Sequence, residues 1–198
     1  MNEVMSSLQP QARSKRVAIP DGADRLGLWV KPLKINSLMS IWMVVQDSAG
    51  AMRTLSLGDL GLTEWRLHEV DIPHDLVPPL NLVSVQVFEP GVGLVLTSGV
   101  ILLDDIHAVL DEGDEEVILE DFESQNRWLP IATSPISLDR ILASAGNAYR
   151  GQKAGLFAFG PTSNKSVRGF YHSTFGGRVP VVASSSLLAA SGHNVGDS

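Results

Sequence analysis

Residues 82–88 read Leu82-Val83-Ser84-Val85-Gln86-Val87-Phe88, and their pattern indicates the fold class. Its valines alternate with Ser84 and Gln86, which is the two-residue period of a β-strand with one buried face. Similar strand-like segments recur at short intervals on both sides, separated by turn residues. They cover residues 26–30, 39–45, 52–57, 65–71 and 100–109. This spacing predicts an antiparallel β-sandwich or barrel rather than alternating strands and helices.

The strand pattern breaks at residues 111–116 and then resumes. Five of these six residues are acidic, which favours a solvated linker over a cation site. Strand-like segments follow at residues 117–123, 155–159 and 167–171. We therefore expect one sandwich over residues 17–173, built from segments 17–110 and 117–173, after a flexible N-terminal arm at 1–16.

Two short segments predict helices instead of strands. Residues 138–145 have a brief helical pattern. Residues 186–191 follow a run of serines that provides an N-cap, and Gly192 comes directly after them as a helix stop. We therefore expect short helices near 138–145 and 186–191.

Composition and charge exclude several classes of function and of stabilising site. The 22 acidic and 15 basic side chains give a net charge of −7, so the average surface repels nucleic acid. Cysteine is absent, which excludes disulfides and thiolate metal sites. The longest apolar stretches, such as residues 94–103, fall short of the roughly 20 residues of a spanning helix. Residues 1–15 lack the apolar core of a signal peptide. We expect neither a nucleic-acid partner nor a membrane segment within this sequence.

The last twenty residues resemble part of a known family. They run from Val179-Pro180-Val181-Val182-Ala183 through three serines and a short Leu/Ala turn to Val195-Gly196-Asp197. This series resembles the segment at which MacB/FtsX-type ABC transporter permeases enter their extracytoplasmic core domain. The resemblance implies that residues 174–198 begin such a core and that the protein lies at the extracytoplasmic face of the cell membrane. Membrane-spanning segments would then lie outside this sequence, and the partners would be other parts of the transporter or an extracytoplasmic partner protein.

A second resemblance covers much of the remaining chain. Asp121-Phe122-Glu123, with Trp128 and Gly151 after it, resembles the start of a carbohydrate-binding-module jelly roll, and Leu102-Leu103-Asp104-Asp105-Ile106 resembles its final strand. In this chain, the segment that resembles the end of the module therefore precedes the segment that resembles its start. Either the chain holds the tail of one module and the head of the next, or the halves form one circularly permuted jelly roll. The second interpretation is attractive because half a sandwich exposes strand edges and half a core. Residues 110–116 are also only long enough to join neighbouring strands.

The jelly-roll resemblance also implies site residues. It places a structural calcium ion between Glu123 and Asp105, whose carboxylates are the hard oxygen ligands that this ion prefers. The alternative is that both are surface acids, and we expect no cofactor to be required. Trp128 is the candidate ligand-binding residue for a glycan. The other tryptophans of the first segment, Trp29, Trp42 and Trp65, lie within apolar strands, which favours core positions over a sugar-stacking surface.

The sequence does not predict catalytic residues. No G-x-S-x-G motif occurs. Asp104 and Asp105 are adjacent on a predicted strand, where neighbouring side chains point to opposite faces, so they should not flank one bond. We predict a non-catalytic recognition or structural module of an ABC transporter permease, with a carbohydrate-binding module as the alternative.

Overall fold

The computed structural model describes residues 17–34, 39–61, 63–88, 99–110, 115–123, 128–130, 140–145, 147–159 and 167–172. Every regular element in these ranges is a β-strand. The strands are β1 (Val17–Ile19), β2 (Ala23–Lys34), β3 (Ser40–Gln46), β4 (Met52–Asp59), β5 (Arg66–Asp71), β6 (Leu80–Phe88), β7 (Gly99–Leu110), β8 (Glu115–Glu120), β9 (Trp128–Pro130), β10 (Arg140–Ala145), β11 (Lys153–Phe159) and β12 (Val167–His172).

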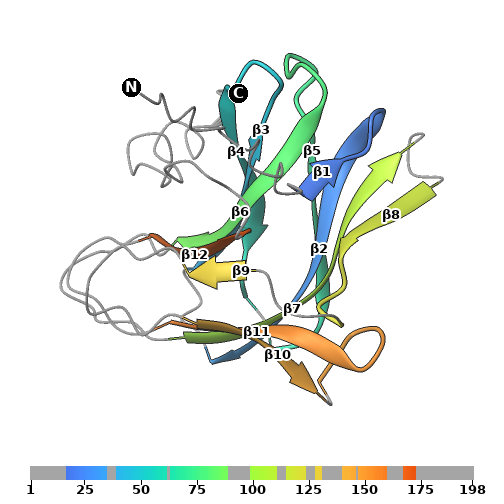
Figure 1. Ribbon diagram of the computed structural model, residues 1–198. Helices are drawn as coiled ribbons and strands as arrows, with labels where there is room; N and C mark the ends of the chain where they lie inside the picture. The colour runs from blue at the N-terminus through green and yellow to red at the C-terminus, as the bar shows by residue number, and fades with distance from the viewer. Residues whose placement is uncertain are drawn as a thin grey trace, which may run out of the picture.

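The strands form two antiparallel sheets (Figure 1). The first has the order β4-β3-β6-β12-β9, with β1 also paired to β6. The second has the order β10-β11-β7-β2-β5, with β8 also paired to β7. These two sheets confirm the predicted all-β, antiparallel sandwich. The finer jelly-roll topology stays a prediction from the resemblance.

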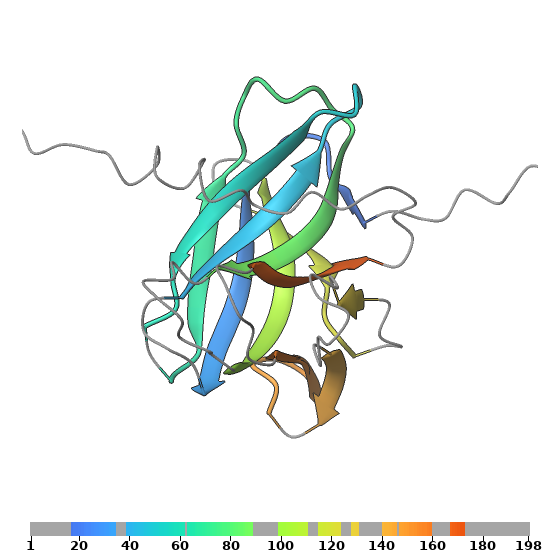
Figure 2. The ribbon, with the colours of Figure 1, turned by 90° about the vertical axis from the view of Figure 1, so that its left-hand side faces the viewer.

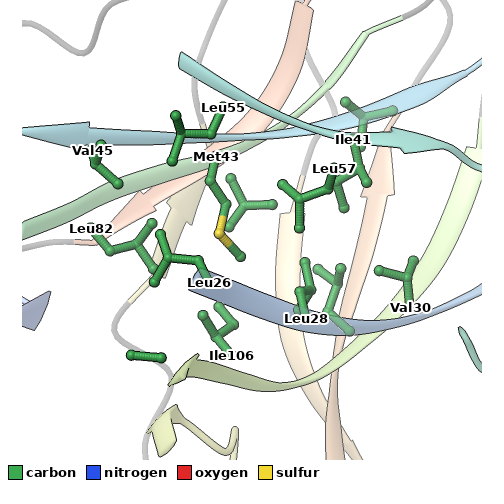
Figure 3. Close-up of a cluster of buried hydrophobic side chains, with 14 of the residues drawn as sticks. Leu26, Leu28, Val30, Ile41, Met43, Val45, Leu55, Leu57, Leu82 and Ile106 are labelled. Carbon is green, nitrogen blue, oxygen red and sulfur yellow. The ribbon is translucent and has the colours of Figure 1, made fainter. Parts of the chain in front are cut away.

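One hydrophobic core lies between the sheets (Figure 3). Alternate residues of β2 contribute Leu26, Leu28 and Val30, and alternate residues of β3 contribute Ile41 and Met43, all fully buried. This alternation follows from strand geometry, because every second side chain points to the same face. The core is therefore shared by both sheets.

Each sheet also contains strands from both segments of the chain. In Figure 2, β12 runs beside β6, and the two strands pair from Val167↔Phe88 to Tyr171↔Ser84. In the other sheet, β7 pairs with β8 and with β11 along different parts of its length. The β7–β8 pairing agrees with the expectation that residues 110–116 join neighbouring strands.

The helix predicted near 138–145 is wrong. Residues 140–145 form strand β10, which pairs with β11 from Arg140↔Ala158 to Ala145↔Lys153. A short apolar run is compatible with either a helix or a strand, since periodicity does not separate them at this length. The hydrogen bonds offered by the neighbouring β11 decide the outcome in favour of a strand.

Three sequence expectations fall outside the described residues: the arm at 1–16, the second helix at 186–191 and the permease core-like segment at 174–198. Within the described part of the chain, no helix has the length and hydropathy needed to cross a membrane.

Candidate functional site

Three aromatic side chains gather near the second sheet and form the aromatic cluster: Trp29, Trp65 and Tyr149. The rings of Trp29 and Tyr149 are stacked, with centroids 3.7 Å apart and planes inclined by 16°. Trp65 is tilted by 58° against Tyr149 at a centroid distance of 5.9 Å. All three residues are half-buried, so part of the cluster is open to solvent.

Strand alternation explains why Trp29 faces outward. Its neighbours Leu28 and Val30 are fully buried in the core, which places Trp29 on the opposite, outer face of β2. Trp65 comes directly before β5, the strand next to β2. Tyr149 belongs to residues 147–152, which directly precede β11 and are called the 147–152 loop.

The predicted positions of the tryptophans are confirmed only in part. Trp42 is buried, with 9% of its surface exposed, as the sequence indicated. Trp29 and Trp65 are instead half-buried outside the core cluster. On a strand, Trp29 shares a face with Lys31, two residues away, and not with its direct neighbour Leu28. This was the sequence signal for its outward position.

Trp128, the predicted ligand-binding residue, lies in the core. Only 2% of its surface is exposed, and its indole Nε1 donates a hydrogen bond to Glu120 Oε2 at 3.0 Å. A ring in this position has no open face for a sugar to stack on. Among the aromatic residues whose burial is described, Trp29, Trp65 and Tyr149 are the ones that are partly open to solvent.

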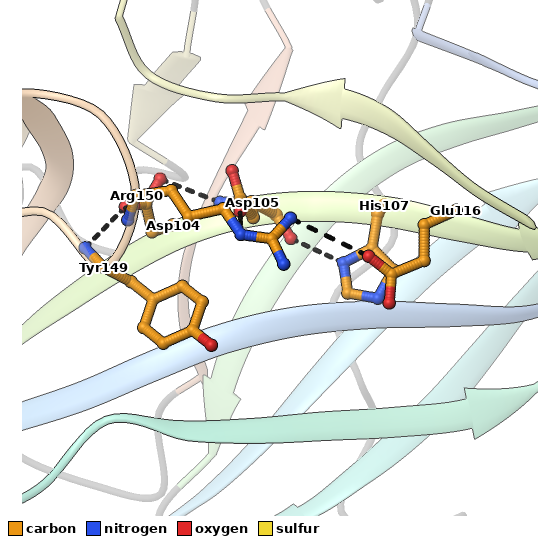
Figure 4. A network of polar contacts seen from close by, with 6 residues as sticks. All are labelled: Asp104, Asp105, His107, Glu116, Tyr149 and Arg150. Atoms are coloured by element: carbon orange, nitrogen blue, oxygen red, sulfur yellow. Dashed lines mark hydrogen bonds and ion pairs between the residues drawn. The ribbon is translucent and has the colours of Figure 1, made fainter.

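Asp104 fixes the 147–152 loop onto β7 (Figure 4). Its Oδ2 accepts the backbone N–H groups of Tyr149 at 2.8 Å and Arg150 at 3.0 Å, and its Oδ1 accepts the N–H of Asp105 at 2.9 Å. Burial raises the pKa of the Asp104 carboxyl, and these three N–H donors oppose the rise. A buried side chain of β7 thus positions the backbone that carries Tyr149.

Asp105 turns toward the same loop because β7 contains a bulge. The β2–β7 register shifts between Gly27↔His107 and Trp29↔Asp104, which gives β7 one extra residue at this point. Asp105 has a φ of 45°, in the left-handed region that non-glycine residues seldom adopt. Its Oδ2 lies 3.3 Å from Arg150 Nε. The expectation that Asp104 and Asp105 serve opposite faces is therefore wrong, since both contact the 147–152 loop.

The surroundings of Asp105 are mostly acidic. Burial raises the pKa of its carboxyl, Arg150 and His107 lower it, and repulsion from Asp121 and Glu116 raises it further. Arg150 Nη1 also lies 3.8 Å from Glu116 Oε2. We call Asp104, Asp105, Glu116 and Asp121 the acidic centre.

His107 lies beneath this centre and is 1% exposed. Its Nδ1 is 2.8 Å from the Asp105 carbonyl oxygen, so Nδ1 carries the proton and donates. Its Nε2 is buried without a hydrogen-bond partner. The imidazole is packed against Gly27, where an added Cβ would lie 2.2 Å from Nε2.

Glu123 holds the other end of the same loop. Its Oε1 accepts the backbone N–H of Gln152 at 2.5 Å and that of Lys153 at 2.8 Å. Lys153 Nζ also donates to the Glu123 carbonyl oxygen at 2.9 Å. These backbone donors lower the pKa of the Glu123 carboxyl. Gly151 adopts a φ of 69° between the two anchored ends, where a Cβ would collide with Glu123 Oε1.

The two predicted calcium ligands, Asp105 and Glu123, thus contact one loop but are each engaged by protein groups. The guanidinium of Arg150 accompanies Asp105, and two backbone amides occupy Glu123 Oε1. Among the residues that the structure describes, no group of three or more His, Cys, Asp or Glu is arranged to hold a metal ion. A calcium ion takes six to eight oxygen ligands, and the side chains of the described residues do not provide such a set around Asp105 and Glu123.

Within the described residues, Asp104 and Asp105 hold the 147–152 loop against β7. The Asp104 carboxylate accepts hydrogen bonds from three backbone N–H groups, and Asp105 faces a guanidinium, so both carboxylates are engaged by protein groups at the loop.

The comparisons with protein-family models, curated proteins and solved structures give no match to this chain.

Proposed function

We propose that this chain is a non-catalytic recognition module on the extracytoplasmic face of the cell membrane, belonging to a MacB/FtsX-type ABC transporter permease. The aromatic cluster is the observation that carries the recognition role. The resemblance of residues 179–198 to a permease segment supports the transporter assignment. The partner in this proposal is another part of the transporter or an extracytoplasmic partner protein.

The chemistry of the cluster suits recognition. Trp and Tyr supply most of the binding energy in many protein interfaces, because their large rings bury much apolar area at low entropic cost. Leu67 lies opposite Trp29 in the β2–β5 register and is 37% exposed, which extends the apolar area. Because the backbone of Tyr149 is anchored by Asp104, little further ordering is needed on binding.

The location is tested first, in cells that produce the full-length gene product with an epitope tag in this module. Protease added to spheroplasts should remove the tag while a cytosolic marker survives. The tagged protein should also sediment with membranes. A tag that is protected from protease, or that stays in the soluble fraction, would overturn the transporter proposal.

The recognition surface is tested by site-specific photo-crosslinking in the same cells. A photoreactive residue in place of Trp65 should crosslink to another transporter chain or to an extracytoplasmic protein. The same residue in place of Val77, which is 54% exposed and lies outside the cluster, is the matched control. Equal crosslinking from the two positions would contradict a specific role for the aromatic cluster.

Carbohydrate binding is the second candidate, and the same cluster favours it. Half-buried Trp and Tyr rings offer apolar faces beside a charged group, since the Arg150 guanidinium lies 5.8 Å from the centre of the Tyr149 ring. Affinity electrophoresis with a panel of soluble glycans tests it. Retardation that is lost in Trp65→Ala and kept in Val77→Ala would favour the carbohydrate-binding module over the protein-recognition proposal.

A further inference from the structure

The acidic centre requires a positive charge. The Asp105 side chain is only 5% exposed, and its Oδ2 is a buried atom without a hydrogen-bond donor. Glu116 and Asp121 act on the Asp105 carboxylate by repulsion. A buried carboxylate among like charges is unfavourable unless a cation accompanies it.

Arg150 brings that cation from within the chain. Its guanidinium approaches Asp105 through Nε at 3.3 Å and Glu116 through Nη1 at 3.8 Å. Its backbone N–H donates to Asp104, so both ends of the residue are fixed by acids. A guanidinium stays protonated at every physiological pH and its planar fork suits two carboxylates at once. Figure 4 shows the Arg150 side chain extending along β7 between these carboxylates.

A metal ion and this guanidinium compete for one position. A calcium ion lies 2.3–2.6 Å from its oxygen ligands, and a guanidinium nitrogen at 3.3 Å from Asp105 Oδ2 occupies the approach to that atom. The second predicted ligand, Glu123, already accepts two backbone amides through Oε1. The jelly-roll resemblance therefore leads to a calcium expectation that the described side chains do not meet.

We propose that the Arg150 guanidinium is a built-in counter-ion of the acidic centre and takes the place that the jelly-roll resemblance gives to calcium. The 147–152 loop, and with it Tyr149, is consequently held in place without a metal ion. The proposal is independent of which partner the aromatic cluster binds.

Thermal unfolding with a calcium chelator and with millimolar calcium tests this. The Tm of the wild-type chain should be the same in both conditions. Arg150→Ala should have a lower Tm in chelator, because the acidic centre loses its cation. Calcium should raise the Tm of this variant, by an amount that grows with the logarithm of the calcium concentration.

Arg53→Ala is the matched control, because Arg53 is similarly exposed and pairs with Asp75 away from the acidic centre. Its Tm should not respond to calcium. A wild-type Tm that rises with calcium would overturn the proposal. An Arg150→Ala variant as insensitive to calcium as the wild type would overturn it equally.

A second variant covers the case in which Arg150→Ala does not fold. Adding Asp105→Asn to it removes the buried charge that needed the counter-ion, so the double variant should fold with a Tm close to that of Asp105→Asn alone. If Asp105→Asn folds alone and the double variant does not, Arg150 has another structural role and the counter-ion proposal fails.

Discussion

Gly27 is the residue that lets the buried His107 ring lie against β2. The imidazole is 1% exposed, so neighbouring groups prevent it from moving away from an added methyl group. The Cβ of an alanine at position 27 would lie 2.2 Å from Nε2 and 2.5 Å from Cε1. The absence of a side chain at this position is therefore a packing requirement.

Gly27→Ala should destabilise the fold by about 1–3 kcal/mol, the usual effect of overpacking a filled interior. Chemical denaturation of the variant and the wild type measures the difference. Gly61→Ala is the control, because no atom lies within 4 Å of the Cβ it would add. Equal stability of Gly27→Ala and Gly61→Ala would contradict the packing of His107 against β2.

Glu123 should make the fold sensitive to acid. Its pKa is lowered in the folded chain by the Lys153 and Gln152 amides, so its ionised form is favoured by folding. The stabilisation is therefore fully present above the ordinary glutamate pKa of about 4.3 and is lost as the pH falls through the lower, folded-state value. Glu123→Gln should show a smaller loss of Tm than the wild type between neutral and acidic pH.

Glu64→Gln, a change at an exposed acid, is the control for this pH series. All other carboxyl groups are present in both the wild type and Glu123→Gln, so the difference between the pH profiles of these two proteins reports Glu123 alone. A Glu123→Gln pH profile that parallels the wild-type profile would show that the hydrogen bonds from the loop N–H groups to the Glu123 carboxylate do not stabilise the fold.

Strand β7 organises the candidate site. It pairs with β2 along one edge and with β11 and β8 along the other. Its bulge carries Asp105 toward the 147–152 loop, and Asp104 anchors the backbone of that loop. A single strand therefore connects the core, the acidic centre and the aromatic cluster.

Asp104→Ala should release the loop from β7. Leaving a buried donor without an acceptor costs about 1–3 kcal/mol, and Asp104 serves three donors. We expect a loss of more than about 2 kcal/mol in unfolding free energy and faster amide exchange at Tyr149 and Arg150. Exposed Asp59→Ala on β4 should change neither quantity. Unchanged exchange at residues 149 and 150 would contradict the anchoring role of Asp104.

The two segments of the chain complete each other in both sheets. β12 extends the sheet of β6, while β8 and β11 extend the sheet of β7. Phe122 and Phe157 enter the core from the second segment. Removing that segment uncovers the edges of two long strands and opens the core at the same time.

A fragment limited to Val17–Leu110 should therefore be insoluble or molten. Circular dichroism should show no cooperative thermal transition, and amide signals should be poorly dispersed in an NMR spectrum. The complete chain, prepared in the same way, is the control. A soluble monomeric fragment with a cooperative melt would show that residues 17–110 fold independently.

Local pattern was sufficient for much of the fold. The alternation at residues 82–88 predicted the strand β6, although Ser84 and Gln86 are buried and do not form an exposed face. The apolar segment at 26–30 falls within β2, and the segment at 39–45 matches β3 except for Met39. The short acidic run at 111–116 predicted that the strands on either side would be neighbours, as β7 and β8 are, although Glu115 and Glu116 already belong to β8. These features depend on residues close together in the chain, where the two-residue period of a strand is directly visible.

The all-β class and most strand positions thus follow from the amino-acid sequence alone, because side-chain alternation is a local property. The formation of β10 by residues 140–145 depends on tertiary contacts, since pairing with β11 overrides a weak helical preference. Tertiary contacts likewise stack Tyr149 on Trp29 and bring Asp104 and Asp105 to one loop. Asp104 and Tyr149 are 45 residues apart, and contacts at that separation arise from strand pairing and a bulge that no local pattern encodes.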